Sequence, residues 1–204
     1  MKAIPVIGIC GGVGAGKSSV AAAFTRAGAA VVDSDQANRE VLARPDVRDE
    51  LVSWWGSEVV GPDGAVNRRA VAEIVFGDPA ARKRLESLTH PLIGQLRAHK
   101  IEAVRESSSA KAIVLDSPLL IESKLDRECD FIVFVDADAA QREQRARESR
   151  GWSREEWMRR ERCQASLDEK RSRADFVIRN DGDIRALDAQ VEAVLKEVDR
   201  RILN

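Results

Sequence analysis

The sequence predicts an α/β fold in which helices flank a parallel β-sheet. The first observation is an apolar run at residues 5–10 that leads through a glycine-rich segment into an alanine-rich helical stretch at 19–27, followed by a second apolar run at 29–32. Strand, helix and strand in this order form the unit of a parallel sheet. The second observation is that three later runs have the length and apolar composition of buried strands, at residues 113–115, 131–135 and 174–178.

The glycine-rich segment has the pattern of a phosphate-binding loop, because Gly11, Gly16, Lys17 and Ser18 fit G-x-x-x-x-G-K-[ST]. Glycines let successive backbone N–H groups point at a phosphate, and the following helix adds donors and a partial positive charge. Lys17 would reach the β- and γ-phosphates, and the Ser18 hydroxyl would ligate Mg²⁺. The alternative is a plain turn. The pattern predicts a nucleoside triphosphate site formed by Gly12, Val13, Gly14, Ala15, Gly16, Lys17, Ser18 and Ser19.

Composition and charge narrow the class of protein. The chain has 204 residues, which suits one compact domain, and its 33 basic and 34 acidic residues leave a net charge of −1, so we expect no general nucleic-acid binding. No apolar run approaches the roughly 20 residues of a membrane span, and the early first strand leaves no room for a signal peptide. The three cysteines show no C-x-x-C spacing, which favours a reducing cytoplasm over disulfide or metal roles.

Three aspartates follow predicted strands. Asp33 and Asp35 come after the run at 29–32, and ligands of parallel sheets bind beyond the carboxyl ends of the strands, on the side of the phosphate loop. We expect their alternation to turn one carboxylate towards the ligand space and the other aside. They could act as a general base, as a Mg²⁺ partner or as the cap of a helix at 36–42. Asp116 ends a strand that resembles a Walker B strand, whose aspartate lies near the metal.

Residues 36–109 have an almost entirely helical pattern, which is too long for one crossover, so we expect an inserted substrate-binding domain. Arg39 lies one helical turn after Asp35, where it either binds an anionic substrate or forms an i,i+4 salt bridge. His90 precedes Pro91, and we expect this pair to interrupt the helix, because a residue before proline is disfavoured in the α region. The histidine is either structural or a substrate ligand.

The stretch 138–173 is rich in arginine and glutamate, and two helices are predicted within it, with Ser153 capping the second. One interpretation is a solvated helical hairpin whose charges balance. The other is a lid that brings arginines over the phosphates of ATP, where they stabilise the transition state. The pattern does not choose between Arg145, Arg147 and Arg150. The core would then comprise residues 1–35, 110–137 and 174–204.

Several further motifs occur in the order found in one enzyme family and, with the phosphate loop, span nearly the whole chain. They are Asp33-Ser-Asp35 with Arg39, His90-Pro91, Leu115-Asp116-Ser-Pro-Leu-Leu-Ile-Glu122, Gln164 with Glu169-Lys170, and Ala174-Asp-Phe-Val-Ile-Arg-Asn180. On these residues the sequence resembles the dephospho-CoA kinases. Many nucleotide-binding proteins share the phosphate loop, whereas the other motifs together are specific.

The resemblance implies a P-loop NTPase fold like that of the nucleotide-monophosphate kinases, and ATP-dependent phosphorylation of the ribose 3′-hydroxyl of dephospho-CoA with Mg²⁺. It implies that Asp35 is the base that orients this hydroxyl and that Asp33 supports it or the metal. The implied substrate-binding residues are Asp35, Arg39, His90 and Asp116. The lid departs from the family pattern of two arginines four residues apart, because position 149 is a serine. Arg145 and Arg150 therefore both stay candidates for the catalytic arginine beside Lys17.

Two other functions fit a phosphate loop: a different nucleoside or nucleotide kinase, and a nucleotide-controlled switch. The switch normally carries the guanine signature N-K-x-D, which this sequence lacks. The expected partners are ATP and dephospho-CoA, with no nucleic acid and no membrane. We expect a cytoplasmic monomer or small homo-oligomer.

Overall fold

The computed structural model describes residues 4–107 and 109–203. The described chain forms two compact units. Unit 1 contains the residues up to Asp33 and those from Ile101 onward, whereas unit 2 is the segment Ser34–Lys100.

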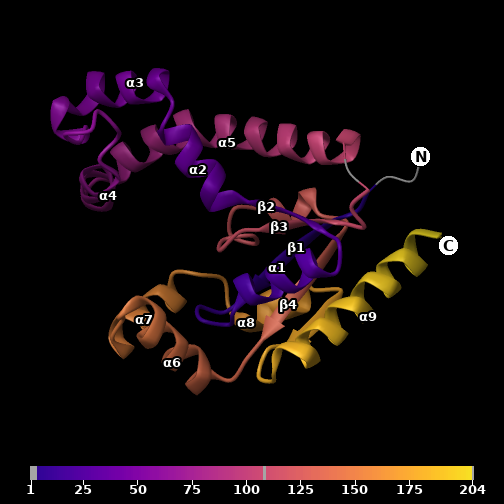
Figure 1. Ribbon diagram of the computed structural model, residues 1–204. Coiled ribbons are helices and arrows are strands. Elements are labelled where there is room, and N and C mark those ends of the chain that lie inside the picture. Colours follow the sequence, from indigo (N-terminus) through magenta and orange to yellow (C-terminus); the bar gives the residue numbers. More distant parts are fainter. Residues whose placement is uncertain (1–3, 108, 204) are drawn as a thin grey trace. The chain divides into compact units, whose positions relative to one another are not determined.

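Unit 1 is built on a parallel sheet, four strands of which are labelled in Figure 1. The described strands lie in the order β2-β3-β1-β4-β5. The strands are β1 (Val6–Gly11), β2 (Ala30–Asp33), β3 (Ile113–Asp116), β4 (Phe131–Asp136) and β5 (Phe176–Arg179). Every neighbouring pair is parallel, so all carboxyl ends meet at one edge. The central strands are continuously apolar because both faces of the sheet are covered. The predicted α/β class is confirmed.

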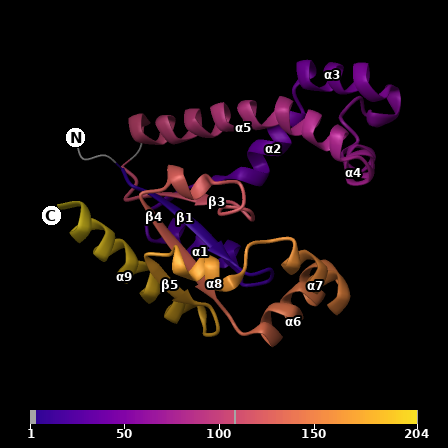
Figure 2. The same ribbon diagram turned by 180° about the vertical axis from the view of Figure 1, so that it is seen from behind.

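Helices α1 (Lys17–Arg26) and α9 (Ile184–Leu203) cover one face of the sheet, where Phe24 and Val191 pack with Ile9 in one buried cluster. The other face carries a second cluster that includes Phe134. Three segments contribute to this cluster: the end of α5 (Pro79–Ser107), the turns at 117–125 with the 3-10 helix Leu125–Glu128, and α8 (Leu167–Ser172). Figure 2 shows α8 and α9 beside the sheet from behind.

A glycine fixes the turn from α1 into β2. Gly28 adopts a φ of +96°, its N–H donates to the carbonyl of Thr25 at 3.0 Å, and the Ala29 N–H donates to that of Phe24 at 2.9 Å. These two bonds form the Schellman motif, which satisfies the last carbonyls of a helix and needs a residue that tolerates positive φ.

The arginine-rich stretch folds as a helical hairpin, which we call the α6–α7 hairpin. Helix α6 (Ala139–Arg150) ends at Gly151 in the left-handed conformation, and α7 (Arg154–Arg162) follows. The Ser153 hydroxyl accepts the N–H of Glu156 at 3.3 Å and so caps α7, as predicted from the sequence.

Unit 2 is helical. It contains α2 (Ser34–Leu42), α3 (Pro45–Trp55), a 3-10 helix (Ser57–Val59), α4 (Arg68–Gly77) and most of α5. Its core is a separate cluster that includes Val41, Leu51 and Val71. Asn67 caps α4 by accepting the Ala70 N–H at 3.2 Å.

The expected interruption at His90-Pro91 is wrong, because α5 runs through Pro91 without a break. A proline inside a helix removes one backbone bond and costs roughly 3 kcal/mol. Apolar side chains on both sides of the proline compensate by packing into the unit 2 cluster: Leu85, Leu88, Leu92, Ile93 and Leu96. The tertiary contacts of α5 therefore outweigh the local preference. Although α5 is long, none of the described helices is long and apolar enough to span a membrane.

Candidate functional site: the phosphate loop of unit 1

The phosphate loop leaves the carboxyl end of β1 and enters α1, whose first residue is Lys17. Gly14 and Gly16 have φ values of +83° and +84°, which only glycine adopts without strain. A Cβ at Gly14 would overlap the Arg142 carbonyl, and one at Gly16 would overlap the Asn180 amide. Both glycines are therefore required by the backbone conformation and by close packing.

Side chains from outside the loop bind its backbone. Around Val13, the indole Nε1–H of Trp157 donates to the carbonyl at 3.0 Å, and the Val13 N–H donates to Oε2 of Glu161 at 2.9 Å. Glu161 is in turn ion-paired with the buried Arg142. The Val13 side chain packs with Ala146 and Trp157 in the small core of the α6–α7 hairpin. The hairpin is thus docked on the phosphate loop.

The carbonyl of Ala15 is bound in a similar way. The Asn180 Nδ2–H donates to it at 2.8 Å, and the Arg145 guanidinium donates to it at 3.4 Å. Arg145 also donates to the Asn180 carbonyl at 2.7 Å. Two of the predicted site elements, the loop and Arg145, are therefore in direct contact.

Lys17 lies in a strongly perturbing environment. Burial lowers the pKa of its ammonium group, the carboxylate of Asp116 opposes this effect, and the positive charges of Lys170 and Arg150 lower the pKa further. Desolvated cations that lie near other cations are typical of sites that bind an anion. Arg150 itself is stacked on Trp152, with 4.7 Å between the guanidinium carbon and the ring centroid.

Three side chains of unit 1 are the predicted oxygen donors for a metal ion: Ser18, Asp33 and Asp116. Asp33 and Asp116 are register partners on β2 and β3, and Ser18 is exposed in the first turn of α1. Among the described residues, no group of three or more His, Cys, Asp and Glu side chains could hold a metal ion. This donor set suits Mg²⁺, which takes one or two carboxylates and completes its shell with water and substrate phosphates.

The other predicted residues belong to unit 2, where Asp35, Arg39 and His90 are all exposed. Arg39 Nε donates to the backbone carbonyl of Asp35 at 3.3 Å. The expected strand alternation of Asp33 and Asp35 is wrong, because α2 begins at Ser34 and Asp35 is helical.

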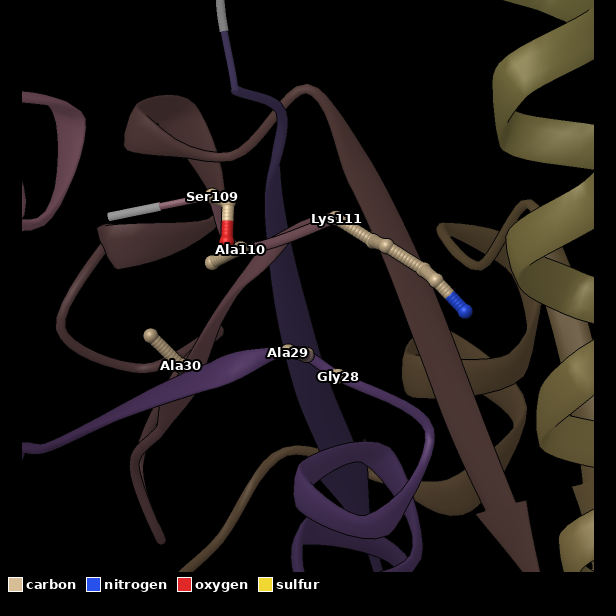
Figure 3. Close-up of a pocket in the computed structure, with 6 residues that line it drawn as sticks. All are labelled: Gly28, Ala29, Ala30, Ser109, Ala110 and Lys111. Carbon is tan, nitrogen blue, oxygen red and sulfur yellow. The ribbon is translucent and has the colours of Figure 1, made fainter.

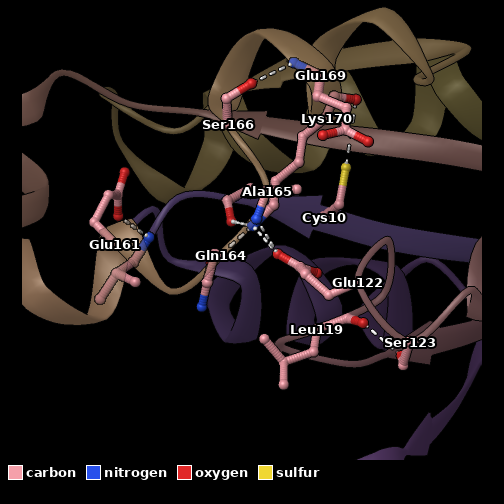
Figure 4. A network of polar contacts seen from close by, with 12 residues as sticks. Cys10, Leu119, Glu122, Ser123, Glu161, Gln164, Ala165, Ser166, Glu169 and Lys170 are labelled. Carbon is pink, nitrogen blue, oxygen red and sulfur yellow. Dashed lines mark hydrogen bonds and ion pairs between the residues drawn. The ribbon is translucent and has the colours of Figure 1, made fainter.

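A buried network beneath the loop was missed by sequence reasoning (Figure 4). Lys170 is 1% exposed. Its Nζ donates to Gln164 at 2.7 Å and to the Gly11 carbonyl at 3.4 Å, and it forms an ion pair with Glu122 at 3.1 Å. Glu122 also accepts the Ala165 N–H at 2.7 Å. The family motifs contain Glu122, Gln164 and Lys170, but no pattern in the sequence indicated that they meet.

Breaking this network should destabilise the protein. We expect Lys170→Met to lower the free energy of unfolding by about 3–5 kcal/mol, because it leaves the Glu122 carboxylate desolvated and without its cation. The double variant Lys170→Met/Glu122→Leu should lose much less, since it removes both charges. Urea denaturation of the three proteins measures this. The exposed i,i+4 pair Arg69–Glu73 supplies the control, and Arg69→Met should leave the transition midpoint unchanged. A double variant as unstable as Lys170→Met would contradict the argument.

A second prediction concerns Cys10, which is 2% exposed in β1. Burial raises the pKa of its thiol from 9.0 to about 11. Above pH 9 the unfolded thiol ionises while the folded one keeps its proton, so the folded state loses relative stability as the pH rises from 9 to about 11. Wild type and Cys10→Ala should therefore converge in free energy of unfolding over this range. A difference between them that is independent of pH would refute the assignment.

A shallow pocket of about 300 Å³ lies elsewhere in unit 1 (Figure 3). It is lined by Gly28, Ala29, Ala30, Ser109, Ala110 and Lys111. These residues precede or begin β2 and β3, so the pocket lies at the amino ends of the strands. Ligands of parallel sheets bind at the opposite edge, which makes the phosphate loop the candidate site.

The similarity of this chain to known proteins covers nearly its whole length and is not limited to the phosphate loop. A sequence model of the dephospho-CoA kinase family matches residues 5–186. The dephospho-CoA kinase of Thermobifida fusca is 35% identical over 198 residues, which cover 96% of this chain and 97% of that protein. The dephospho-CoA kinase of Deinococcus radiodurans is 37% identical over 193 residues, which cover 95% and 92%. A crystal structure from Thermus thermophilus is similar with a TM-score of 0.83 at 36% identity, over 96% of this chain and 98% of that one. The chain belongs to the dephospho-CoA kinase family.

Proposed function

We propose that the protein transfers the γ-phosphoryl group of ATP to the ribose 3′-hydroxyl of dephospho-CoA and releases CoA and ADP, the last step of coenzyme A biosynthesis. The observation that carries this proposal is the family match over residues 5–186, which contains the phosphate loop and every predicted site residue. The half-buried ammonium of Lys17, whose pKa is lowered by desolvation, supports it, because such a group favours a bound phosphate.

ATP is assigned to the phosphate loop. The amides of the loop and the start of α1 would bind its phosphates, with Lys17 on the β- and γ-phosphates. Ser18, Asp33 and Asp116 would hold Mg²⁺, which neutralises charge on the β- and γ-oxygens when it is bound. Catalysis of this kind consists mainly of positioning and charge stabilisation, because the protein makes no covalent bond to the phosphoryl group.

The acceptor is assigned to residues of unit 2. Asp35 is proposed as the base that orients the ribose hydroxyl and accepts its proton, while Arg39 and His90 bind anionic or polar groups of dephospho-CoA. Their exposure supports this assignment, because a substrate can reach all three side chains. Asp33 directly precedes unit 2 in the chain and is proposed to support the base or the metal.

Arg150 is the stronger of the two candidate arginines. Arg145 already donates to two backbone carbonyls, those of Ala15 and Asn180. Arg150 acts electrostatically on Lys17 and is supported by the ring of Trp152. We therefore assign Arg150 to the charge that develops on the transferring phosphoryl group, and Arg145 to the structure of the loop.

The finer organisation is proposed from the same features. Unit 2 serves as the substrate-binding insertion, the α6–α7 hairpin with α8 covers the nucleotide, and the rest of unit 1 is the core. The near-neutral charge and the three free cysteines support a cytoplasmic enzyme that acts on small molecules as a monomer or small homo-oligomer.

A coupled assay of ADP release tests the function. Purified protein with ATP, Mg²⁺ and dephospho-CoA should release ADP and form CoA, and the Lys17→Ala variant should not. A panel of nucleosides and nucleoside monophosphates serves as the comparison. Phosphorylation of a nucleoside monophosphate without phosphorylation of dephospho-CoA would refute the proposed acceptor.

A further inference from the structure

The direction of the loop amides can be derived from the carbonyls that precede them. No described peptide bond is cis, and in a trans peptide the C=O and the following N–H point in opposite directions. A protein group that binds the carbonyl of one residue therefore also fixes where the N–H of the next residue points.

Trp157 binds one such carbonyl. Its indole donates to the oxygen of Val13, so the N–H of Gly14, on the same peptide plane, points away from the Trp157 indole. Trp157 is 8% exposed and packs against the Val13 side chain, which holds the indole in place. Glu161 accepts the Val13 N–H and so restrains the preceding peptide, which joins Gly12 to Val13.

Asn180 binds the second carbonyl. Its amide donates to the oxygen of Ala15, so the N–H of Gly16 points away from Asn180. Asn180 is 8% exposed and lies directly against Gly16. Neither the Gly14 N–H nor the Gly16 N–H donates a hydrogen bond to another group in the described chain, so both remain available to an anion.

We infer that Trp157 and Asn180 are positioning residues for ATP, which set the direction of the Gly14 and Gly16 amides through the carbonyls of Val13 and Ala15. Neither side chain needs to touch the nucleotide. The two residues lie 144 and 165 residues from the loop residues that they bind, and they act on two separate peptide planes. Their effect is preorganisation, since amides that already point at the phosphates lose less freedom when ATP binds.

Two conservative variants test the inference. Trp157→Phe keeps most of the packing and removes only the N–H donor, while Asn180→Ala removes the amide. Each should weaken ATP binding about fivefold, which is about 1 kcal/mol and the ordinary net value of one hydrogen bond. Because the two side chains act on different peptides, the double variant should lose roughly the product of both factors.

Trp54→Phe is the matched control. Its indole N–H also donates one hydrogen bond, to Glu50 at 2.8 Å, but within α3 of unit 2. Calorimetric titration with ATP measures the dissociation constant of each variant, and steady-state kinetics separates the KM for ATP from the KM for dephospho-CoA. We expect the values for ATP to rise in the Trp157 and Asn180 variants, with the KM for dephospho-CoA unchanged and Trp54→Phe like wild type.

A purely structural role would give a different pattern. Lower melting temperatures together with an ATP dissociation constant within twofold of wild type in both single variants would overturn the inference. The titration contains no acceptor, so it is independent of the proposed reaction. Wild-type protein that binds ATP but leaves dephospho-CoA unchanged would refute the proposed function and would leave this comparison intact.

Discussion

Lys17→Ala is expected to lower the rate of CoA formation by roughly three orders of magnitude or more. Removing one preorganised group from the developing charge costs about 10²–10³-fold, and a cation on a transferring phosphoryl group is worth up to about 10⁵-fold. Binding of ATP should weaken as well, because Lys17 provides positive charge in a desolvated place. Rapid-quench or coupled assays at saturating ATP measure the rate, and titration measures the affinity.

The same variant should remain folded. Burial lowers the pKa of Lys17, so the charged side chain destabilises the folded state when no ligand is bound. At a pH below this lowered pKa, replacing the lysine removes that unfavourable contribution to the free energy of folding. Lys17→Met preserves the aliphatic stem and is the matched control for packing. Both variants should melt at or above the temperature of wild type. Substantial activity in either folded variant would show that another group contacts the γ-phosphate.

Asp35→Asn is expected to reduce kcat by roughly 10²–10⁴-fold, the usual contribution of a general base. The amide keeps the size of the side chain but can neither accept the proton nor orient the hydroxyl as an anion. The KM values for ATP and dephospho-CoA should change much less than kcat, since Asp35 is proposed to act on the reacting hydroxyl alone. Measurement of both KM values and kcat with purified enzyme separates the two effects.

Asp46→Asn is a suitable control for Asp35→Asn. Asp46 is an exposed aspartate in the first turn of a neighbouring helix, α3, where it pairs with Arg44 at 2.7 Å. This substitution should leave kcat unchanged. Near-normal turnover in folded Asp35→Asn would reject Asp35 as the base and direct attention to Asp33.

The strands and the helix around the loop could be anticipated, as could the cap of α7, because the apolar runs and Ser153 are local signals. Each of these features lies within a few residues of the element it defines, and each is present in the structure. Asp33 and Asp116 were expected at strand ends, but their pairing in register depends on which strands are neighbours, and no local signal encodes that.

The contacts of the phosphate loop could not be anticipated. Val13 is bound by Trp157 and Glu161, and Ala15 by Asn180, over sequence separations of 144, 148 and 165 residues. No periodicity or spacing encodes such pairs, because they depend on how the sheet brings distant segments to one edge. The prediction of a helix break at Pro91 was wrong for a related reason. The His-Pro dipeptide shows only the local preference of the backbone, and the burial of neighbouring leucines overrides that preference.

The insertion of unit 2 into unit 1 has a consequence for the order of events during synthesis. Strand β1 is central in the sheet, but its partners β3 and β4 are translated roughly a hundred residues later, because Val6 pairs with Ile113 and Ile7 with Phe131. Closing so long a loop is entropically costly and slows folding. Unit 2 has its own apolar cluster and leaves the ribosome before β3, so it can collapse first and shorten the effective loop. The strand that leads into the nucleotide site is thus among the first parts made and among the last to be paired.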